Sequence, residues 1–365
     1  MNFMMIILWN AMAVMGATDE LFEKFKVEME HGKRWSVSEI VKRKAVFLAN
    51  IAHINELNTK YGEHFGVNKY ALMTTEEKRH LMGKKVPEEY KKSYKKANPP
   101  QFKKTSLPES LIFCGNYNVN NGKKYDYCAS KTQNQGECGS CYAFGVAQLL
   151  ETKYAMKTGR KEQISAQQIL DCNTGSSERC CGGFPQDVLK HVKGYTTEKA
   201  YPYKDFYTSM DDCSRNKCEK KSSVLKVKSY KSFDNCYTEE CVKSVLNNYG
   251  PFVTSMYASQ DLQYYTHGVL DLDCGNPNIG TNHVVVVVGY GVEGGKAFLV
   301  IRNSWGDNWG ENGYFRISWN DLCGIGGNDA GAMPTSVLVD ITTEKLQSGV
   351  VPYFALLVLF ALSVM

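Results

Sequence analysis

The hydrophobic pattern changes character about 100 residues into the chain, which indicates two regions of different structural class. Residues 19–60 are predicted to be helical, with Ser38 as the N-cap. Apolar residues recur there at close to helical spacing, namely at Ile40, Phe47, Ile51, Ile54 and Leu57. Residues 84–104 are rich in lysine and proline and poor in core-forming residues, which predicts an exposed and easily cut linker.

Beyond this linker, cysteines appear, glycines multiply and runs of β-branched residues predict strands at His283–Tyr290 and Ala297–Arg302. No internal repeat is present. A helical segment, a cleavable basic linker and a cysteine-rich α+β body together are typical of an enzyme precursor.

Both ends of the chain are apolar. The run Phe3–Trp9, followed by small residues at Gly16 and Ala17, predicts a signal peptide over residues 1–17 and passage through the secretory pathway. Residues 350–365 are uncharged and apolar but short for a transmembrane helix. We expect the segment 341–365 to be a GPI-attachment signal, with Asp340 or Thr342 as the attachment position, or a tail anchor; a processed or buried tail is the alternative.

Charge is spread unevenly over the 365 residues. Residues 18–103 contain 18 basic and 12 acidic side chains, a net charge of +6, whereas the rest of the chain has a net charge of −1. The basic residues of the first part interleave with glutamates on helical faces, and no stacking aromatics are grouped with them. Nucleic acid is therefore not expected as a partner.

The thirteen cysteines all lie at or after Cys114. An odd number suggests a set of disulfides with one remaining thiol, and such a density is unusual in a reducing cytosol. The cysteines therefore agree with the predicted signal peptide.

One cysteine, Cys141, stands where a nucleophile is expected. A glycine-rich turn brings it to the start of an apolar helical run over residues 142–158, where helix N–H groups favour a thiolate and lower the thiol pKa. Gln135, six residues earlier, can offer a side-chain N–H to a developing oxyanion beside the backbone N–H of Cys141. Cys138 and Cys141 also form a Cys-x-x-Cys pair, so a zinc site, a redox site or a purely structural pair are the alternatives.

A thiolate needs a base, and the base needs to be held in place. His283 enters an apolar strand, and Asn303 can fix its imidazole through a hydrogen bond without adding a charge. Trp305 can cover that bond and exclude water. A single histidine at a strand edge is more often structural, so the assignment depends on the whole set of motifs.

That set resembles the papain-like cysteine proteases of the cathepsin family. The matching residues occur in family order over nearly all of residues 105–335: Gln135, Cys138-Gly139-Ser140-Cys141, Ala143-Phe144, Cys172, Gly182-Gly183, Tyr201-Pro202-Tyr203, Gly250-Pro251, His283, Gly289-Tyr290-Gly291 and Asn303-Ser304-Trp305-Gly306. The resemblance implies an α+β papain-like fold of two domains, a helical left domain and a β-barrel-like right domain, over residues 105–340. It also implies cleavage of peptide bonds by Cys141, His283 and Asn303, with Gln135 in the oxyanion hole, and no metal or other cofactor.

The segment 18–104 is similar to the inhibitory propeptide of this family, in its cathepsin L branch. Residues of its helix signature are Glu39, Arg43, Phe47, Asn50, Ile54 and Asn58, and Gly66-x-Asn68-x-Tyr70 resembles the next motif. The implied partners are protein and peptide substrates, the chain's own propeptide, cystatin-like inhibitors and, through the tail, a membrane. The implied locations are lysosome-like vesicles, the cell exterior or the cell surface.

By the same resemblance, Gly182 and Gly183 pair with the substrate backbone. Phe184, Pro185 and Asn328 form the pocket for the second residue before the cut, and Trp305 is also expected to bind substrate. An apolar wall and a neutral floor predict a preference for apolar side chains over arginine there. A shift of one residue in the alignment would put Asp329 on the floor and reverse the preference.

Several positions depart from the family pattern. Tyr142 replaces the usual Trp, Leu72 stands where the propeptide motif has Asp, and the stretch before Cys141 is about ten residues longer than usual, with Cys114 and Cys128 in it. The resemblance implies the disulfides Cys138–Cys180, Cys172–Cys213 and Cys274–Cys323, with Cys218 as a substitute for Cys213. Proximity suggests Cys114–Cys128 and Cys236–Cys241.

Two other functions compete with a peptidase. A catalytically silent binding module on the same fold is disfavoured because Cys141, His283, Asn303 and Gln135 are all present. A thiol oxidoreductase would need a strand directly before Cys138, where the sequence is polar and turn-like. Among peptidases we expect an endopeptidase, because residues 204–220 contain no histidine pair that could hold a substrate terminus.

Overall fold

The computed structural model describes most of the chain. The described ranges are residues 3–30, 34–83, 86–87, 97–99, 101–102, 106–117, 121–129, 131–208, 212–214, 216–272, 274, 280–320, 322–327 and 336–343. The apolar residues 350–365, most of the linker and the positions 328–329 lie outside them.

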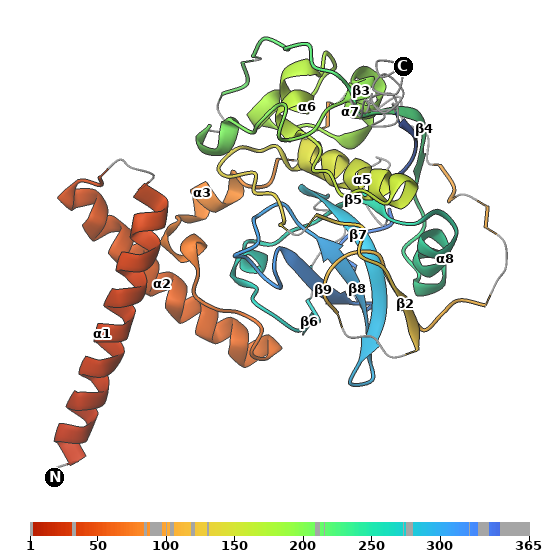
Figure 1. The fold of residues 1–365 in the computed structure, drawn as a ribbon. Helices are drawn as coiled ribbons and strands as arrows, with labels where there is room; N and C mark the ends of the chain where they lie inside the picture. The colour runs from red at the N-terminus through yellow and green to blue at the C-terminus, as the bar shows by residue number, and fades with distance from the viewer. Residues whose placement is uncertain are drawn as a thin grey trace, which may run out of the picture.

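The first part of the chain is helical, as predicted, and lies to one side of a larger body (Figure 1). Its elements are α1 (Phe3–Glu30), α2 (Val37–Tyr61), the 3₁₀ turn η1 (Lys69–Leu72) and α3 (Thr75–Arg79). Helix α1 runs across the boundary predicted at residue 17. The expected N-cap Ser38 is wrong: Ser36 caps α2, and its hydroxyl accepts the Glu39 N–H at 3.2 Å.

The body combines a helical layer with a mixed sheet. The helices are α5 (Cys141–Thr158), α6 (Ala166–Cys172), α7 (Pro185–His191) and α8 (Glu239–Tyr249), with 3₁₀ turns η2 (Arg179–Cys181), η3 (Asp205–Tyr207) and η4 (Gln260–Tyr264). The strands are β1 (Ser110–Ile112), β2 (Gly122–Lys124), β3 (Gly194–Tyr195), β4 (Leu225–Phe233), β5 (Phe252–Met256), β6 (Val269–Leu270), β7 (His283–Glu293), β8 (Lys296–Arg302), β9 (Tyr314–Ser318) and β10 (Ser336–Thr343).

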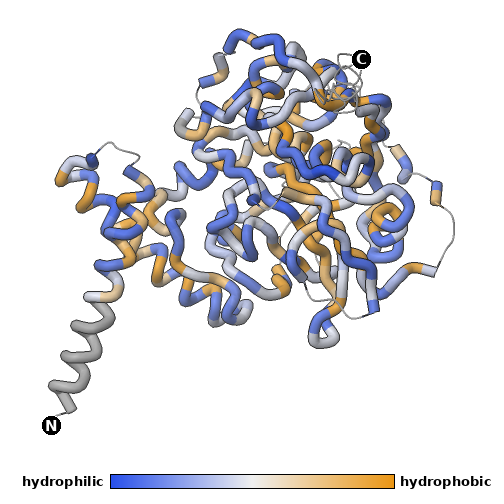
Figure 2. Tube along the Cα trace, in the orientation of Figure 1, coloured by the Kyte–Doolittle hydropathy of each residue, from blue (hydrophilic) through white to orange (hydrophobic). Residues whose placement is uncertain are grey.

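Along the sheet the order is β3-β4-β10-β5-β7-β8-β9-β6, and β1 joins β7 to β2. The predicted strands at residues 283–290 and 297–302 correspond to β7 and β8, which pair antiparallel. Strand β7 is buried on both faces from His283 to Gly291, which explains its unbroken run of valines. The apolar residues of Figure 2 gather along these central strands and on α5.

The start of α5 lies directly on the start of β7. A Cβ added to Gly145 would come within 2.8 Å of a Val284 methyl group and 3.0 Å of a Val253 methyl group. Any side chain at this position would push the helix off the sheet. Gly145 therefore fixes how closely the residues one turn earlier on α5 approach the start of β7.

The extra residues before α5 form an annex to the sheet. Strand β1 pairs with β7 and with β2, and the Cys114–Cys128 disulfide closes the segment. Below it, Arg302 donates to Glu151 at 2.8 Å, and both side chains are fully buried. Arg302 also donates to the Cys128 sulfur at 3.2 Å, so the annex covers this buried ion pair. Removing either partner would leave an uncompensated buried charge and destabilise the fold.

Six disulfides use every cysteine except Cys141. They are Cys114–Cys128, Cys138–Cys180, Cys172–Cys218, Cys181–Cys213, Cys236–Cys241 and Cys274–Cys323. The expected Cys172–Cys213 pair is wrong, because Cys218 takes that place and Cys213 pairs with Cys181. The sequence could not decide whether Cys213 or Cys218 pairs with Cys172. The decision depends on Cys181, which binds Cys213 although its neighbour Cys180 binds Cys138.

The last described strand, β10, continues to Thr343, three residues past the domain end predicted at 340. It pairs with β4 along its length, so Asp340 and Thr342 lie within the sheet. Within the described part of the chain, no helix combines the length and the apolar character needed to cross a bilayer.

Candidate active site

Cys141 is the first residue of α5, as predicted, and it is buried. The N-cap Ser140 makes no side-chain capping bond to the helix. At this position the positive end of the α5 dipole favours negative charge on the Cys141 sulfur.

His283 begins β7, and Asn303 follows the end of β8. Because these two strands are antiparallel neighbours, the two side chains meet: His283 Nε2 lies 2.8 Å from Asn303 Oδ1. Trp305 lies over this pair, with ring centroids of His283 and Trp305 5.1 Å apart and the indole 1% exposed. The contact is thus shielded from water, as the sequence suggested.

Hydrogen bonding fixes which nitrogen of His283 carries the proton. Asn303 Oδ1 also accepts the backbone N–H of Ser304 at 2.8 Å, so this atom is the oxygen of the amide. His283 Nε2 must then be the donor. Nδ1 is left with its lone pair and has no hydrogen-bond partner among the described residues.

The environment keeps His283 neutral in this form of the protein. The imidazole is completely buried, and this burial lowers its pKa to about 4, while the hydrogen bond to Asn303 opposes the shift. A neutral imidazole with a lone pair on Nδ1 is ready to accept a proton.

The close packing of α5 on β7 brings the nucleophile toward this base. Gly145 lies one turn after Cys141 on α5, and Val284, which Gly145 contacts, follows His283 directly on β7. Residues four apart share a helix face, so Cys141 is on the side of α5 that meets the start of β7.

Gln135 is buried and rigidly held. Its Oε1 accepts the Ser304 hydroxyl at 2.6 Å, and its Nε2 donates to the Cys138 carbonyl at 3.0 Å. The same Nε2 donates at 2.9 Å to the carbonyl of Leu81, which belongs to the first part of the chain. The side-chain amide of Gln135 thus holds the Leu81 carbonyl near the start of α5.

The segment 81–83 lies directly on the predicted substrate-binding residues. Gly183 N–H donates to the carbonyl of Gly83 at 2.9 Å. The approach is so close that a Cβ at Gly83 would lie 1.8 Å from the carbonyl oxygen of Gly139. This stretch of the first region therefore covers the site.

The covering segment is supported by a second contact surface. Phe65 forms an antiparallel bridge with Tyr265, and Gln263 exchanges hydrogen bonds with Asn68 and Lys78 around η4. Further along, Ala97 and Asp234 are joined by two hydrogen bonds.

Inside the first region, Arg43 binds a carboxylate although Leu72 takes the place of the Asp in the propeptide motif. The guanidinium donates to the backbone carbonyl of Leu72 at 3.0 Å and binds both carboxylate oxygens of Glu77. Glu39 completes the set at 2.6 Å. The charge missing at residue 72 is thus supplied by Glu77.

The remaining predicted residues divide into two groups. Phe184 and Pro185 lie at the start of α7, where Phe184 is 1% exposed, and Gly182 ends the turn before them. Asn328 and the alternative Asp329 lie outside the described residues. No cluster of metal ligands occurs in the described part of the molecule.

The sequence did not indicate the role of Ser304. It joins two parts of the site, because its hydroxyl holds Gln135 and its N–H holds Asn303. Its position directly after Asn303 was the one available signal, and only the structure shows that the side chain turns back toward Gln135.

Comparison with known proteins now adds to the geometry. The family model described as "Papain family cysteine protease" matches residues 117–333, and "Cathepsin propeptide inhibitor domain (I29)" matches residues 22–77. The Cathepsin L-like proteinase of Phaedon cochleariae is 30% identical over 333 residues, which cover 88% of this chain and 94% of that one. Cysteine endopeptidase RepA of Oryza sativa subsp. japonica is 31% identical, with 79% and 76% covered. The solved structure of digestive procathepsin L 3 from Tenebrio molitor larval midgut is 25% identical, with a TM-score of 0.70 and 88% and 98% covered.

Proposed function

Because the chain belongs to the papain family of cysteine proteases and carries a cathepsin propeptide, it is a zymogen, and we propose that it is an endopeptidase acting through Cys141, His283 and Asn303. The observation that carries this proposal is the hydrogen-bond pattern around Asn303. It leaves His283 Nδ1 as a proton acceptor near the start of α5.

In the proposed reaction, His283 Nδ1 takes the thiol proton of Cys141, and the sulfur attacks the carbonyl carbon of the scissile bond. The oxyanion is stabilised by Gln135 Nε2 and the backbone N–H of Cys141. Collapse of this intermediate breaks the C–N bond, and the imidazolium gives its proton to the leaving amine. Water, deprotonated by His283, then hydrolyses the thioester and returns the thiol.

Latency follows from the direction of the propeptide. The propeptide contacts Gln135 first, through Leu81, and then contacts Gly183 two residues later, through Gly83. By the resemblance, Gly183 binds a substrate residue before the cut, whereas Gln135 binds the carbonyl that is cut. The propeptide would thus run opposite to a substrate, which puts its peptide bonds in the wrong orientation for attack.

We propose that acidification releases this segment and that the chain is cut between about Lys96 and Leu107. The basic propeptide, with a net charge of +6, faces a peptidase part of the opposite sign. Protonation of carboxylates would weaken that attraction. Part of this stretch lies outside the described residues.

The signal peptide at 1–17 and the tail at 341–365 remain proposals, as does location in vesicles, outside the cell or on its surface. We favour GPI attachment over a direct membrane anchor. Most of the tail lies outside the described residues. Phase separation in Triton X-114 before and after phosphatidylinositol phospholipase C distinguishes the two.

The test of the function is digestion of a peptide library by acid-activated protein, with Cys141→Ala as the control. We expect internal cleavage that is lost in the variant. A pure binding module would cut nothing, and an exopeptidase would remove residues only from peptide ends.

A further inference from the structure

The active-site loop and the loop around η3 are locked together just before Cys138. Glu137 N–H donates to the carbonyl of Phe206 at 2.8 Å. Gly136 has a φ of +63°, and a Cβ there would lie 1.9 Å from the same carbonyl oxygen. Glu137 and Phe206 are therefore fixed side by side, four residues before the nucleophile.

These two residues lie on the side of the cleft that receives the substrate residues after the cut. Propeptide residue Gly83 contacts Gly183, on the side that receives substrate residues before the cut, and Leu81 contacts Gln135 at the catalytic centre. Propeptide residues that precede Leu81 therefore lie on the opposite side of the catalytic centre from Gly183. A small cavity there is lined by Glu137 and Phe206 from the peptidase and by Lys69 and Tyr70 from the propeptide.

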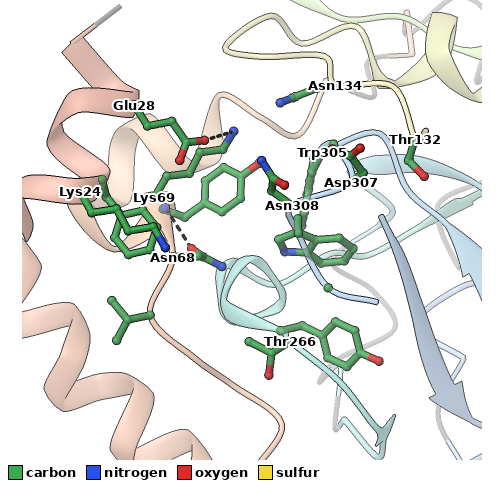
Figure 3. Close-up of a pocket in the computed structure, with 17 residues that line it drawn as sticks. Lys24, Glu28, Asn68, Lys69, Thr132, Asn134, Thr266, Trp305, Asp307 and Asn308 are labelled. Carbon is green, nitrogen blue, oxygen red and sulfur yellow. Dashed lines mark hydrogen bonds and ion pairs between the residues drawn. The ribbon is translucent and has the colours of Figure 1, made fainter. Parts of the chain in front are cut away.

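A propeptide cation already occupies this region. The Lys69 ammonium lies 6.0 Å from the ring centroid of Phe206 and 5.5 Å from that of Tyr70. Its side chain is 17% exposed, and Glu28 pairs with it at 3.3 Å from within the propeptide (Figure 3). The adjoining cavity of about 550 Å³ extends from Lys69 to Trp305.

A second propeptide cation, Arg43, shares a cavity with Glu137. Arg43, together with Glu77 and His80, lines a cavity that Glu137 also borders. Burial and the nearby Glu77 raise the pKa of Glu137, whereas Arg43 and Lys69 oppose that rise. Release of the propeptide removes Glu77 together with both cations from the surroundings of Glu137.

We propose that Glu137 and Phe206 form a subsite that selects a lysine or arginine side chain in the substrate, one to three residues after the cut. The proposal rests on the endopeptidase function given above. A carboxylate attracts the cation, and an aromatic face beside it adds a cation–π contact. In the zymogen, Lys69 lies near the Phe206 ring in this region, with Glu28 as its ion-pair partner.

The test uses acid-activated enzyme and internally quenched peptides that differ only in having Lys, Gln or Glu at each of the three positions after the cut. We expect kcat/KM for Lys to exceed that for Glu by about five- to tenfold at one position, as a partly exposed ion pair allows. Raising the salt concentration should reduce this ratio.

Glu137→Gln should bring the Lys-to-Glu ratio to within about twofold, and Phe206→Leu should reduce it partially. Glu240→Gln on α8, which removes the same charge from an exposed position, should leave it unchanged. An unchanged thermal unfolding midpoint, together with unchanged labelling of Cys141 by iodoacetamide, shows that Glu137→Gln is folded.

A lysine preference that survives Glu137→Gln, or peptides cut equally well whatever the residue, would overturn the subsite and leave the peptidase assignment intact. Failure to cut any peptide would overturn both.

Discussion

The side-chain amide of Gln135 donates a hydrogen bond to the backbone carbonyl of Leu81 across 2.9 Å. The same N–H is the one proposed to stabilise the oxyanion. Inhibition and catalysis would therefore use one donor, and the propeptide must leave Gln135 before a substrate carbonyl can reach it.

Gly83→Val should abolish latency. The new side chain would collide with the Gly139 backbone, which cannot move aside cheaply because it belongs to the active-site loop. We expect the uncut zymogen at neutral pH to hydrolyse a small fluorogenic peptide at least about tenfold faster than the unaltered zymogen, equivalent to about 1.4 kcal/mol. Met82→Val serves as the control, and equal rates for the two variants would contradict the assignment.

Glu77→Gln should make the propeptide release at higher pH. Burial opposes ionisation of Glu77, but its hydrogen bonds to Arg43 and to the Thr74 backbone hold its pKa below the ordinary value. Its stabilising effect is therefore present above the unfolded pKa and is lost as the pH falls through the folded one. We expect the variant to lose about 1 kcal/mol of propeptide stability near neutral pH.

The pH at half-maximal self-processing measures this effect. Glu76→Gln is the matched control, because among the described residues Glu76 pairs with surface side chains, at 3.3 Å with Arg79 and 3.6 Å with His80. If both variants process at the same pH as the unaltered zymogen, Glu77 is not part of the acid response.

His283 should stay neutral at pH 5 in the zymogen. Burial lowers its pKa from 6.5 to about 4, so the unfolded chain binds the extra proton first. The resulting loss of stability is spread between pH 6.5 and 4 and amounts to roughly 3 kcal/mol. Imidazole NMR signals of the Cys141→Ala zymogen report the protonation state, and titration of His283 near pH 6.5 would contradict the buried site.

The pocket for the second residue before the cut should favour leucine over arginine. Phe184 and Pro185 offer an apolar wall, and the proposed floor residue Asn328 is neutral. Paired fluorogenic dipeptides measure the preference. An arginine preference of tenfold or more that Asp329→Asn removes would show that Asp329 lines the pocket instead.

Much of the site was predictable because local patterns carry it. A glycine-rich turn before an apolar helix indicated Cys141. The antiparallel strands that begin at His283 and end just before Asn303 are buried enough to give strong hydrophobic runs. Helix α5 and strands β7 and β8 appear where the sequence predicted them.

The rest depends on contacts between distant segments. Glu77 binds Arg43 and also takes part in the N-terminal capping box of α3. Gly83 packs directly against the backbone of Gly139. Neither contact leaves a periodic signal in the sequence. The partners of Cys172 and Cys213 were likewise decided by the course of the chain between residues 204 and 220.

Mapping of thiol alkylation before and after activation tests the central claim most directly. In acid-activated protein at pH 5–6, iodoacetamide should modify Cys141 alone, because the other twelve cysteines form disulfides, and peptide cleavage should stop in proportion to labelling. The uncut zymogen should resist labelling, since the segment 81–83 covers the site. Cleavage that persists after complete modification of Cys141, or in Cys141→Ala, would contradict the account.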